Sequence, residues 1–424
     1  MLESVSLFQS KKEFFIFLLA CAFVFTYSFL IEFQNYKNLT RFDSNLVSGV
    51  VIKQYIKTKI NKRGKLKTYQ VLQLKSEQGF SFFTTTKKDF QPAIEKRITL
   101  ELWAGKITFY EYMTKFYAYS KILEIDEQKT LKQKLNSSVF HSHANKDIAN
   151  IYQALYTATP LSKELQTTFS TLGVSHLLAI SGFHLGVLSA LLFLLLRRTY
   201  KLFQNRYFPY RNSNRDLFVI VAIVLLGYLL FLDSPDSLLR AFAMLIIGFF
   251  LYDRGIKIIS MQTLFISVIV LLALFPRLFF GIGFWLSVSG VFYIFLFLIH
   301  FKSLSKISQF ILVPFWVYFM MLPFSLTIFS NFSLYHPLSS IWTTVFTLFY
   351  PLSILLHMIS FGDLFDTLLE SLMQLGVDGK TVVLNSLWLK IHILFSFIGI
   401  WKKSFIFILV LWSLLIFLYA FSFV

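Results

Sequence analysis

The sequence predicts a polytopic α-helical membrane protein with a small exported β-barrel domain near its N-terminus. Of its 424 residues, 56% are hydrophobic and only 15% are charged, whereas about a quarter of the residues of a soluble protein are charged. Several stretches approach the roughly 20 consecutive apolar residues that a helix needs to cross a bilayer. A polar region of short strands and turn signals follows the first of these stretches and indicates the β domain.

The first predicted element is an N-terminal transmembrane anchor over residues 1–31. Its apolar run follows Lys11 and Lys12, and these lysines predict a cytoplasmic N-terminus and export of the segment that follows. The run lacks an A-x-A-like cleavage site, so an uncleaved anchor is favoured over a removed signal peptide. Cys21 is the single cysteine and therefore excludes an internal disulfide.

Residues 32–106 form the predicted exported β domain. Its strands are expected at NLVSGVVIKQYI, KLKTYQVLQLK, GFSFFTTT and RITLELW, with turn signals between them. In the second strand, leucines occupy one face and lysines and a tyrosine the other, as the period of two requires. About five short strands in about sixty residues suit a closed or half-closed antiparallel barrel such as the OB-fold.

The exported β domain is strongly basic. Residues 37–106 contain fifteen Lys or Arg and five Asp or Glu, and aromatic residues are interleaved with the basic ones. A surface that binds single-stranded nucleic acid needs cations for phosphates and flat rings for bases. The alternative is that the aromatic side chains form the barrel core, and this is favoured for Phe80 and Phe82. The candidate DNA-binding residues are Lys59, Lys62, Arg63, Lys65, Lys67, Tyr69, Lys87 and Lys88.

An amphipathic helical region is predicted over residues 107–172, lying along the membrane surface. Within it, HSHANKD brings His141, His143 and Asp147 together, as in two-metal nuclease sites. Such a site needs more histidines and acids downstream, and no later histidine lies in soluble sequence long enough to supply them, so a metal site is not favoured. The chain also has no Walker A, H-E-x-x-H or dinucleotide-binding motif. We therefore expect no enzymatic activity, cofactor or metal, and a partner or a gradient must supply any transport energy.

Residues 173–424 form the predicted multi-span domain. The loop 197–215 contains six Lys or Arg and no acid, which predicts a cytoplasmic location. The span before this loop would then begin outside, in agreement with export of the β domain. The segment 307–330 contains Pro314 and Pro323 and is expected to be broken or re-entrant, which would reverse the orientation of the later segments.

The first span of this domain, 173–196, carries unusual polar residues. His176 and His184 are eight residues apart, so on one helix they would share a broad face about 80° wide. Gly182 and Gly186 form a G-x-x-x-G pattern, which permits close helix contact. Polar groups inside a membrane usually face a bundle interior or an aqueous path, although satisfied packing hydrogen bonds are the alternative. The candidate pore-lining residues, which include two from the next segment DSPDSLLRA, are His176, Ser181, Gly182, His184, Asp236 and Arg240.

The stretch GVSHLLAISGFHLG, residues 173–186, resembles the signature of ComEC-type competence proteins, the inner-membrane channels of bacterial DNA uptake. The resemblance covers most of residues 45–360, and the chain is similar to a short form without the C-terminal metallo-β-lactamase-like domain of longer members. Trp285 stands where the family usually has Gln, which argues against a polar role in the pore there. Supporting stretches are LLRAFAM at 238–244, GIGFWLSVSGV at 281–291 and LPFSLTIFSNFSLYHPLSS at 322–340.

The resemblance implies a channel that transports single-stranded DNA into the cytoplasm during natural transformation. It implies a location in the bacterial cytoplasmic (inner) membrane, with a cytoplasmic N-terminus and residues 32–172 in the periplasm. The expected partners are single-stranded DNA, membrane lipids, a periplasmic DNA-binding protein, a cytoplasmic helicase or single-strand-binding protein, and a second copy of the chain. One alternative function is transport of small molecules or lipid-linked precursors, with a basic exported binding domain. A further alternative is a membrane scaffold whose exported domain binds a protein.

Overall fold

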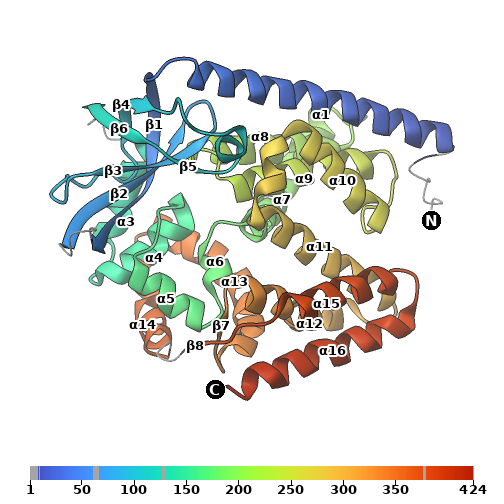
Figure 1. The fold of residues 1–424 in the computed structure, drawn as a ribbon. Helices are drawn as coiled ribbons and strands as arrows, with labels where there is room; N and C mark the ends of the chain where they lie inside the picture. The colour runs from blue at the N-terminus through green and yellow to red at the C-terminus, as the bar shows by residue number, and fades with distance from the viewer. Residues whose placement is uncertain (1–7, 9, 61–65, 127–129, 376–378, 424) are drawn as a thin grey trace. The chain divides into compact units, whose positions relative to one another are not determined.

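The chain divides into two compact units, a strand unit and a helical unit. The strand unit comprises residues 10–135 and 269–282, and the helical unit contains residues 136–268 and 283–424. The computed structural model (Figure 1) describes residues 8, 10–60, 66–126, 130–375 and 379–423.

The strand unit begins with a long apolar helix, α1 (Lys11–Thr40). The hydroxyl of Ser10 caps its first turn by accepting a hydrogen bond from a backbone N–H three residues further on. At its other end, Leu39 is buried in the core of the unit, and the Tyr36 hydroxyl donates to the carbonyl oxygen of Ile107 at 3.0 Å. The C-terminal end of α1 therefore packs into the core of the strand unit.

The centre of the strand unit is a six-stranded sheet with the strand order β5-β3-β2-β1-β4-β6. Neighbouring strands are antiparallel except for the short parallel pair β3–β5. The Thr84 hydroxyl on β3 and the Ser120 hydroxyl on β6 lie 2.7 Å apart inside the unit, which shows that the sheet is curled. This arrangement is compatible with a half-closed barrel. The strands are β1 (Asn45–Ile60), β2 (Leu66–Ser76), β3 (Ser81–Thr86), β4 (Arg97–Trp103), β5 (Phe116–Tyr117) and β6 (Tyr119–Ile125).

The inner face of this sheet is apolar, as the period of two predicts. Leu72 and Leu74 on β2 are fully buried, and so are Phe80 and Phe82 at β3. Phe82 and Phe80 also pack against each other, with ring centroids 5.8 Å apart. The interpretation of these two phenylalanines as core residues is therefore confirmed.

The structure differs from the sequence prediction just after the fourth strand. Residues 107–172 were expected to be helical, but only the short helix α2 (Phe109–Met113) precedes two further strands, β5 and β6. Strand β6 pairs with the free edge of β4 along its whole length. Residues 116–125 form strands because the sheet edges give them more hydrogen bonds and burial than a surface helix would provide, and the next helix, α3, begins at Leu131.

The helical unit starts with four short helices and continues with longer apolar ones. The short helices are α3 (Leu131–His141), which begins in the strand unit, α4 (Lys146–Thr157), α5 (Lys163–Thr171) and α6 (Ser175–Leu178). The later helices are α7 (Gly182–Tyr207), α8 (Ser213–Phe231), α9 (Asp236–Asp253), α10 (Met261–Leu274), α11 (Ile282–His300), α12 (Lys306–Ile328), α13 (Ser339–Met358), α14 (Asp366–Gln374), α15 (Ser386–Gly399) and α16 (Lys403–Phe421). The strands β7 (Asn331–Phe332) and β8 (Lys380–Thr381) form a small antiparallel pair.

Seven helices in the described part of the chain are long and apolar enough to cross a membrane. They are α1, α7, α8, α11, α12, the segment His336–Met358 that contains α13, and α16. Helices α10 and α15 are apolar but shorter, and α9 carries three charged residues, Asp236, Arg240 and Asp253. The chain is therefore a polytopic helical membrane protein with a largely antiparallel sheet near its N-terminus.

Helix α12 corrects one prediction. Pro314 and Pro323 were expected to break the segment 307–330, but both lie inside a continuous helix from Lys306 to Ile328. Prolines are tolerated in membrane helices because neighbouring groups satisfy the carbonyls that they leave unpaired. The proposed reversal of orientation after this segment therefore loses its structural basis.

Candidate functional site

The polar stretch at the start of the multi-span region is a break between two helices. Helix α6 ends at Leu178 and α7 starts at Gly182, with extended backbone at Ala179 and Ser181. The Ser181 hydroxyl accepts a hydrogen bond from the backbone N–H of Phe183 at 3.3 Å, and the Ser181 N–H donates to His184 Nδ1 at 3.3 Å. These capping bonds start a new helix at Gly182, so the segment 173–196, predicted as one span, is interrupted at Ser181.

The two histidines of this stretch do not share a helix face, and that prediction is wrong. His176 is exposed on α6, where its Nδ1 lies 3.1 Å from the Gly173 carbonyl oxygen and its Nε2 lies 3.3 Å from the Thr343 hydroxyl. His184 is 1% exposed and packs its ring against Tyr350, with centroids 4.8 Å apart. The angle of 80° applies to one continuous helix, and the chain turns between these residues instead.

Gly182 lies where α7 packs closely against α9. A Cβ atom at this position would lie 3.0 Å from the Cβ of Ala241, whereas a Cβ at Gly186 would meet nothing within 4 Å. The predicted close contact through small residues therefore holds for Gly182 and not for Gly186.

The N-terminal end of α9 supports the break. The Ser237 hydroxyl donates to the carbonyl oxygen of Ile180 at 2.6 Å, which satisfies a carbonyl that the break releases from helical bonding. Arg240, one turn further along α9, donates to the Gly283 carbonyl oxygen at 3.3 Å, and its Nε is buried without a partner in the described structure. Asp236 is exposed in the first turn of α9. Sequence reasoning missed Ser237, because a serine beside two aspartates has no distinctive pattern.

Hydrogen-bond donors dominate this break. Because His184 Nδ1 accepts from Ser181, the proton of the neutral imidazole belongs on Nε2, and that atom is buried with no partner among the described residues. The Ser181 hydroxyl already accepts the N–H groups of Phe183 and His184, so the start of α7 adds mainly the positive end of its helix dipole. Together with Arg240, these groups suit an anion such as a phosphate rather than a cation.

The outer face of the sheet in the strand unit carries the predicted basic and aromatic residues. After a register shift between Val51 and Lys53, odd-numbered residues of β1 and β2 lie on this face. Burial raises the pKa of Tyr55, with hydrogen bonding to Tyr117 as a further cause. Phe83 stacks on Tyr117, with ring centroids 4.8 Å apart. We call this surface the tyrosine–lysine face, made of Lys53, Tyr55, Lys57, Lys59, Lys67, Tyr69, Phe83 and Tyr117.

The predicted DNA-binding residues fall partly on this face. Lys59 lies opposite Lys67, and Lys57 lies opposite Tyr69, in the β1–β2 pairing. Lys87 and Lys88 follow β3 as exposed residues. Lys62, Arg63 and Lys65 lie outside the described residues. Sequence reasoning missed Tyr117, because its segment was assigned to a helix and not to the sheet edge.

A second polar cluster surrounds the histidine-rich segment after α3. His143 Nδ1 lies 2.9 Å from Asp366, and its Nε2 lies 3.0 Å from His357 Nε2. The His143 ring also stacks on Tyr152, whose pKa burial raises. The described residues contain no group of three or more His, Cys, Asp or Glu arranged to hold a metal ion. The cluster therefore joins the α3–α4 connection to α13 and α14 through hydrogen bonds, a contact over more than 200 residues that sequence reasoning did not anticipate.

The family comparison covers the helical unit almost completely. A family model described as competence protein matches residues 157–423. This range contains the α6–α7 break, α9 and all the candidate spans except α1. No curated protein and no solved structure matches the chain. Because the match spans more than half of its length, the chain belongs to the family of ComEC-type competence proteins, whose role is DNA uptake.

Proposed function

We propose that the chain is the inner-membrane channel that passes single-stranded DNA into the cytoplasm during natural transformation. Membership of the competence family supports the role in DNA uptake. The proposal that the transported DNA is single-stranded rests on the tyrosine–lysine face, because its aromatic rings and cations fit a single strand and not a duplex.

On this face, flat rings and cations alternate at the spacing of a β-sheet. Tyr69 and Tyr117 both lie close enough to Tyr55 to add to the rise in its pKa that burial causes. Lys57 and Lys59 continue the row along β1, and both side chains are exposed. Exposed rings stack on unpaired bases, and lysines neutralise the phosphates between them without reading sequence.

The α6–α7 break supports passage of the same strand through the helical unit. Broken membrane helices line cavities in transporters, and the N-terminal ends of half-helices point at anionic substrate groups. Here the groups that favour an anion are the positive N-terminal end of α7, Arg240 and His184 Nε2. We propose that these groups contact phosphates one after another and that Ser237 keeps the break in place.

The proposed location is the bacterial inner membrane, with the N-terminus in the cytoplasm and residues 32–172 in the periplasm. Lys11 and Lys12 in front of α1 and the basic segment 197–215 support this orientation. We propose a transport role without catalysis, so that other proteins degrade the second strand, deliver the DNA and pull it inward.

A binding experiment tests the DNA-contacting face. The affinity of the purified full chain for a fluorescent single-stranded oligonucleotide is measured at several salt concentrations. We expect Lys57→Gln with Lys59→Gln to reduce the slope of log affinity against log salt by about 1.4, or about 0.7 for each lost phosphate contact. Lys121→Gln is the matched control, because this lysine lies opposite Glu101 on the β4–β6 pair. An equal loss in the control, or no binding at low salt, contradicts the proposal and favours a transporter of other substrates.

A transformation assay tests the break. Arg240→Ala, at normal protein level, should abolish entry of DNA into the cytoplasm while DNA still accumulates in the periplasm. Arg198→Ala is the control, because Arg198 is an exposed cation of the same unit away from the break. Full uptake with Arg240→Ala would remove the break from the transport path.

A further inference from the structure

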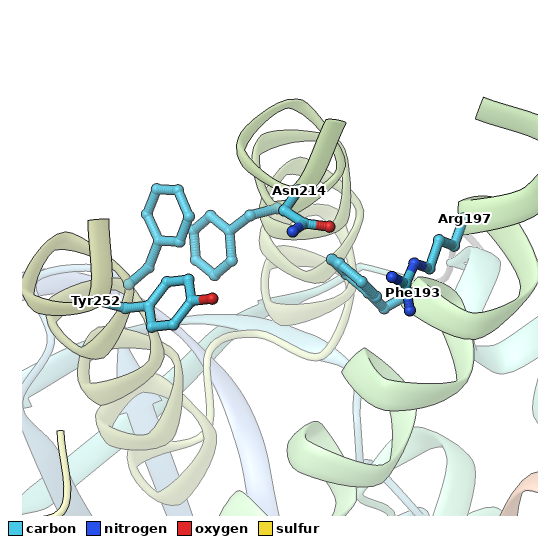
Figure 2. Close-up of a pocket in the computed structure, with 6 residues that line it drawn as sticks. Phe193, Arg197, Asn214 and Tyr252 are labelled. Carbon is cyan, nitrogen blue, oxygen red and sulfur yellow. The ribbon is translucent and has the colours of Figure 1, made fainter. Parts of the chain in front are cut away.

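A pocket of about 330 Å³ lies between three helices of the helical unit, away from the α6–α7 break. Figure 2 shows side chains from α7, α8 and α9 projecting into the space between these helices. Each helix contributes two residues one turn apart. The lining residues are Phe193 and Arg197 on α7, Asn214 and Phe218 on α8, and Phe249 and Tyr252 on α9.

The pocket has an apolar floor and a polar rim. The segment 197–215, predicted as a loop, is helical except at residues 208–212, because α7 continues to Tyr207 and α8 starts at Ser213. In every pair the phenylalanine lies further than its partner from the C-terminal end of α7, the N-terminal end of α8 or the C-terminal end of α9. The ends of α8 and α9 lie together, because Arg215 in the first turn of α8 forms a bidentate ion pair with Asp253 at the end of α9. Phe218 and Phe249 stack face to face, with ring centroids 3.5 Å apart. One helical turn, about 5.4 Å, therefore separates aromatic rings from polar groups.

The polar groups of the rim have no partner within the described protein. Arg197, Asn214 and Tyr252 make no hydrogen bond or ion pair through their side chains with the described residues. By contrast, Arg211 and Arg215 are paired with Asp216 and Asp253. The pocket thus presents one uncompensated guanidinium, one amide and one phenol from three different helices.

We propose that this pocket binds the headgroup of an anionic phospholipid from the leaflet on the side of the α7–α8 connection, residues 208–212. Arg197 would pair with the phosphate diester, and Asn214 and Tyr252 would hydrogen-bond to the glycerol and ester oxygens. The start of the acyl chains would lie on Phe193 and Phe218. Basic pockets between membrane helices take anionic headgroups in this way.

The order of polar and apolar groups favours a lipid over a nucleotide. The rim faces the α7–α8 connection and the floor faces the middle of helices that are long and apolar enough to span a membrane, namely α7 and α8. A phospholipid has the same order, with its anionic head at the interface and its chains inside. A nucleotide would place a polar sugar or base edge against the phenylalanines, where it would find no hydrogen-bond partner among the lining residues.

The test compares lipids that share acyl chains and differ in headgroup charge. The purified full chain in detergent is mixed with phosphatidylglycerol or phosphatidylcholine, and bound lipid is counted by native mass spectrometry. Arg197→Gln is the test variant, and its side chain is exposed and unpaired, so the fold does not depend on it. Arg198→Gln is the matched control, because it removes the next charge on α7 and does not line the pocket.

We expect phosphatidylglycerol to bind more tightly than phosphatidylcholine to the unaltered chain. Arg197→Gln should weaken phosphatidylglycerol binding about tenfold, the loss of one charge-assisted contact, while Arg198→Gln should leave it unchanged. Glycerol 3-phosphate, which has the charge but no acyl chains, should not compete. Equal binding of the two lipids, an equal loss in both variants, or displacement of the lipid by glycerol 3-phosphate or by a single-stranded oligonucleotide overturns the proposal.

Discussion

The ion pair between Glu32 and Arg277 offers a quantitative test of how the strand unit is held together. Glu32 lies on α1, and Arg277 lies in η1 (Pro276–Phe280), the short 3₁₀ helix that follows α10. Their contacts are bidentate, with Arg277 Nε and Nη2 at 2.8 and 2.6 Å from the carboxylate. The guanidinium also lies 4.6 Å from the ring centroid of Tyr112. The pair therefore fastens two segments of the unit that lie 245 residues apart in sequence.

The expected size of its contribution follows from its burial. The side chains of Arg277 and Glu32 are 19% and 20% exposed, so the contribution of the pair to stability should lie between the values measured for exposed and for fully buried ion pairs. Exposed pairs contribute about 0.2–1 kcal/mol, and removing one partner of a fully buried pair costs about 3–5 kcal/mol. We expect Glu32→Gln or Arg277→Met alone to cost about 2–3 kcal/mol, and the coupling energy to be about 1–2 kcal/mol.

A double-mutant cycle measures this coupling. Unfolding midpoints of the full chain in one detergent are compared for the two single variants and the double variant, and single losses on the order of 5–10 °C are expected. Glu77→Gln is the matched control, because the Arg97–Glu77 pair is 59% and 55% exposed and should contribute little. The reasoning fails if the losses of the two single variants add up in the double variant, or if the control loses as much.

Two further predictions concern pH and helix packing. Burial raises the pKa of Tyr112 to about 12 from 10.0, so the contribution of its neutral phenol to stability is complete below pH 10 and is lost as the pH rises through about 12. In an alkaline titration, the free energy of unfolding of Tyr112→Phe should therefore fall less steeply with pH than that of the unaltered chain. Identical curves would refute this. Gly182→Val should cost about 1–3 kcal/mol and reduce transformation, because the Cβ would lie 3.0 Å from Ala241; Gly186→Val, which meets nothing within 4 Å, is the control and should keep a normal unfolding midpoint.

Local signals carried most of what could be predicted. The apolar runs identified a polytopic membrane protein, and the alternation in β2 placed Leu72 and Leu74 inside and Lys67 and Tyr69 outside. The start of α7 at Gly182 also has a local signal, because an N-cap serine acts within a few residues of sequence, but the segment was assigned to one continuous span. The family resemblance in this stretch agreed with the family match.

Errors arose where a local signal competed with a tertiary one. Residues 116–125 resemble an amphipathic helix in composition, but the free edge of β4 pairs with them as a strand. Pro314 and Pro323 signal a break, and the packed neighbours of α12 keep the helix continuous. The shared face of His176 and His184 assumed one helix, which the capping at Ser181 ends.

The sequence by itself determined the class of the protein, its family and the faces of its strands, because motifs and hydrophobic period act between near neighbours. Only the tertiary structure decided which distant groups meet. Ser237 satisfies Ile180, His143 meets His357 and Asp366, and Arg277 meets Glu32, across 57 to 245 residues. A buried carbonyl, imidazole or charge must find a partner somewhere in the fold, but sequence spacing does not say where, since that partner is set by how helices and strands pack.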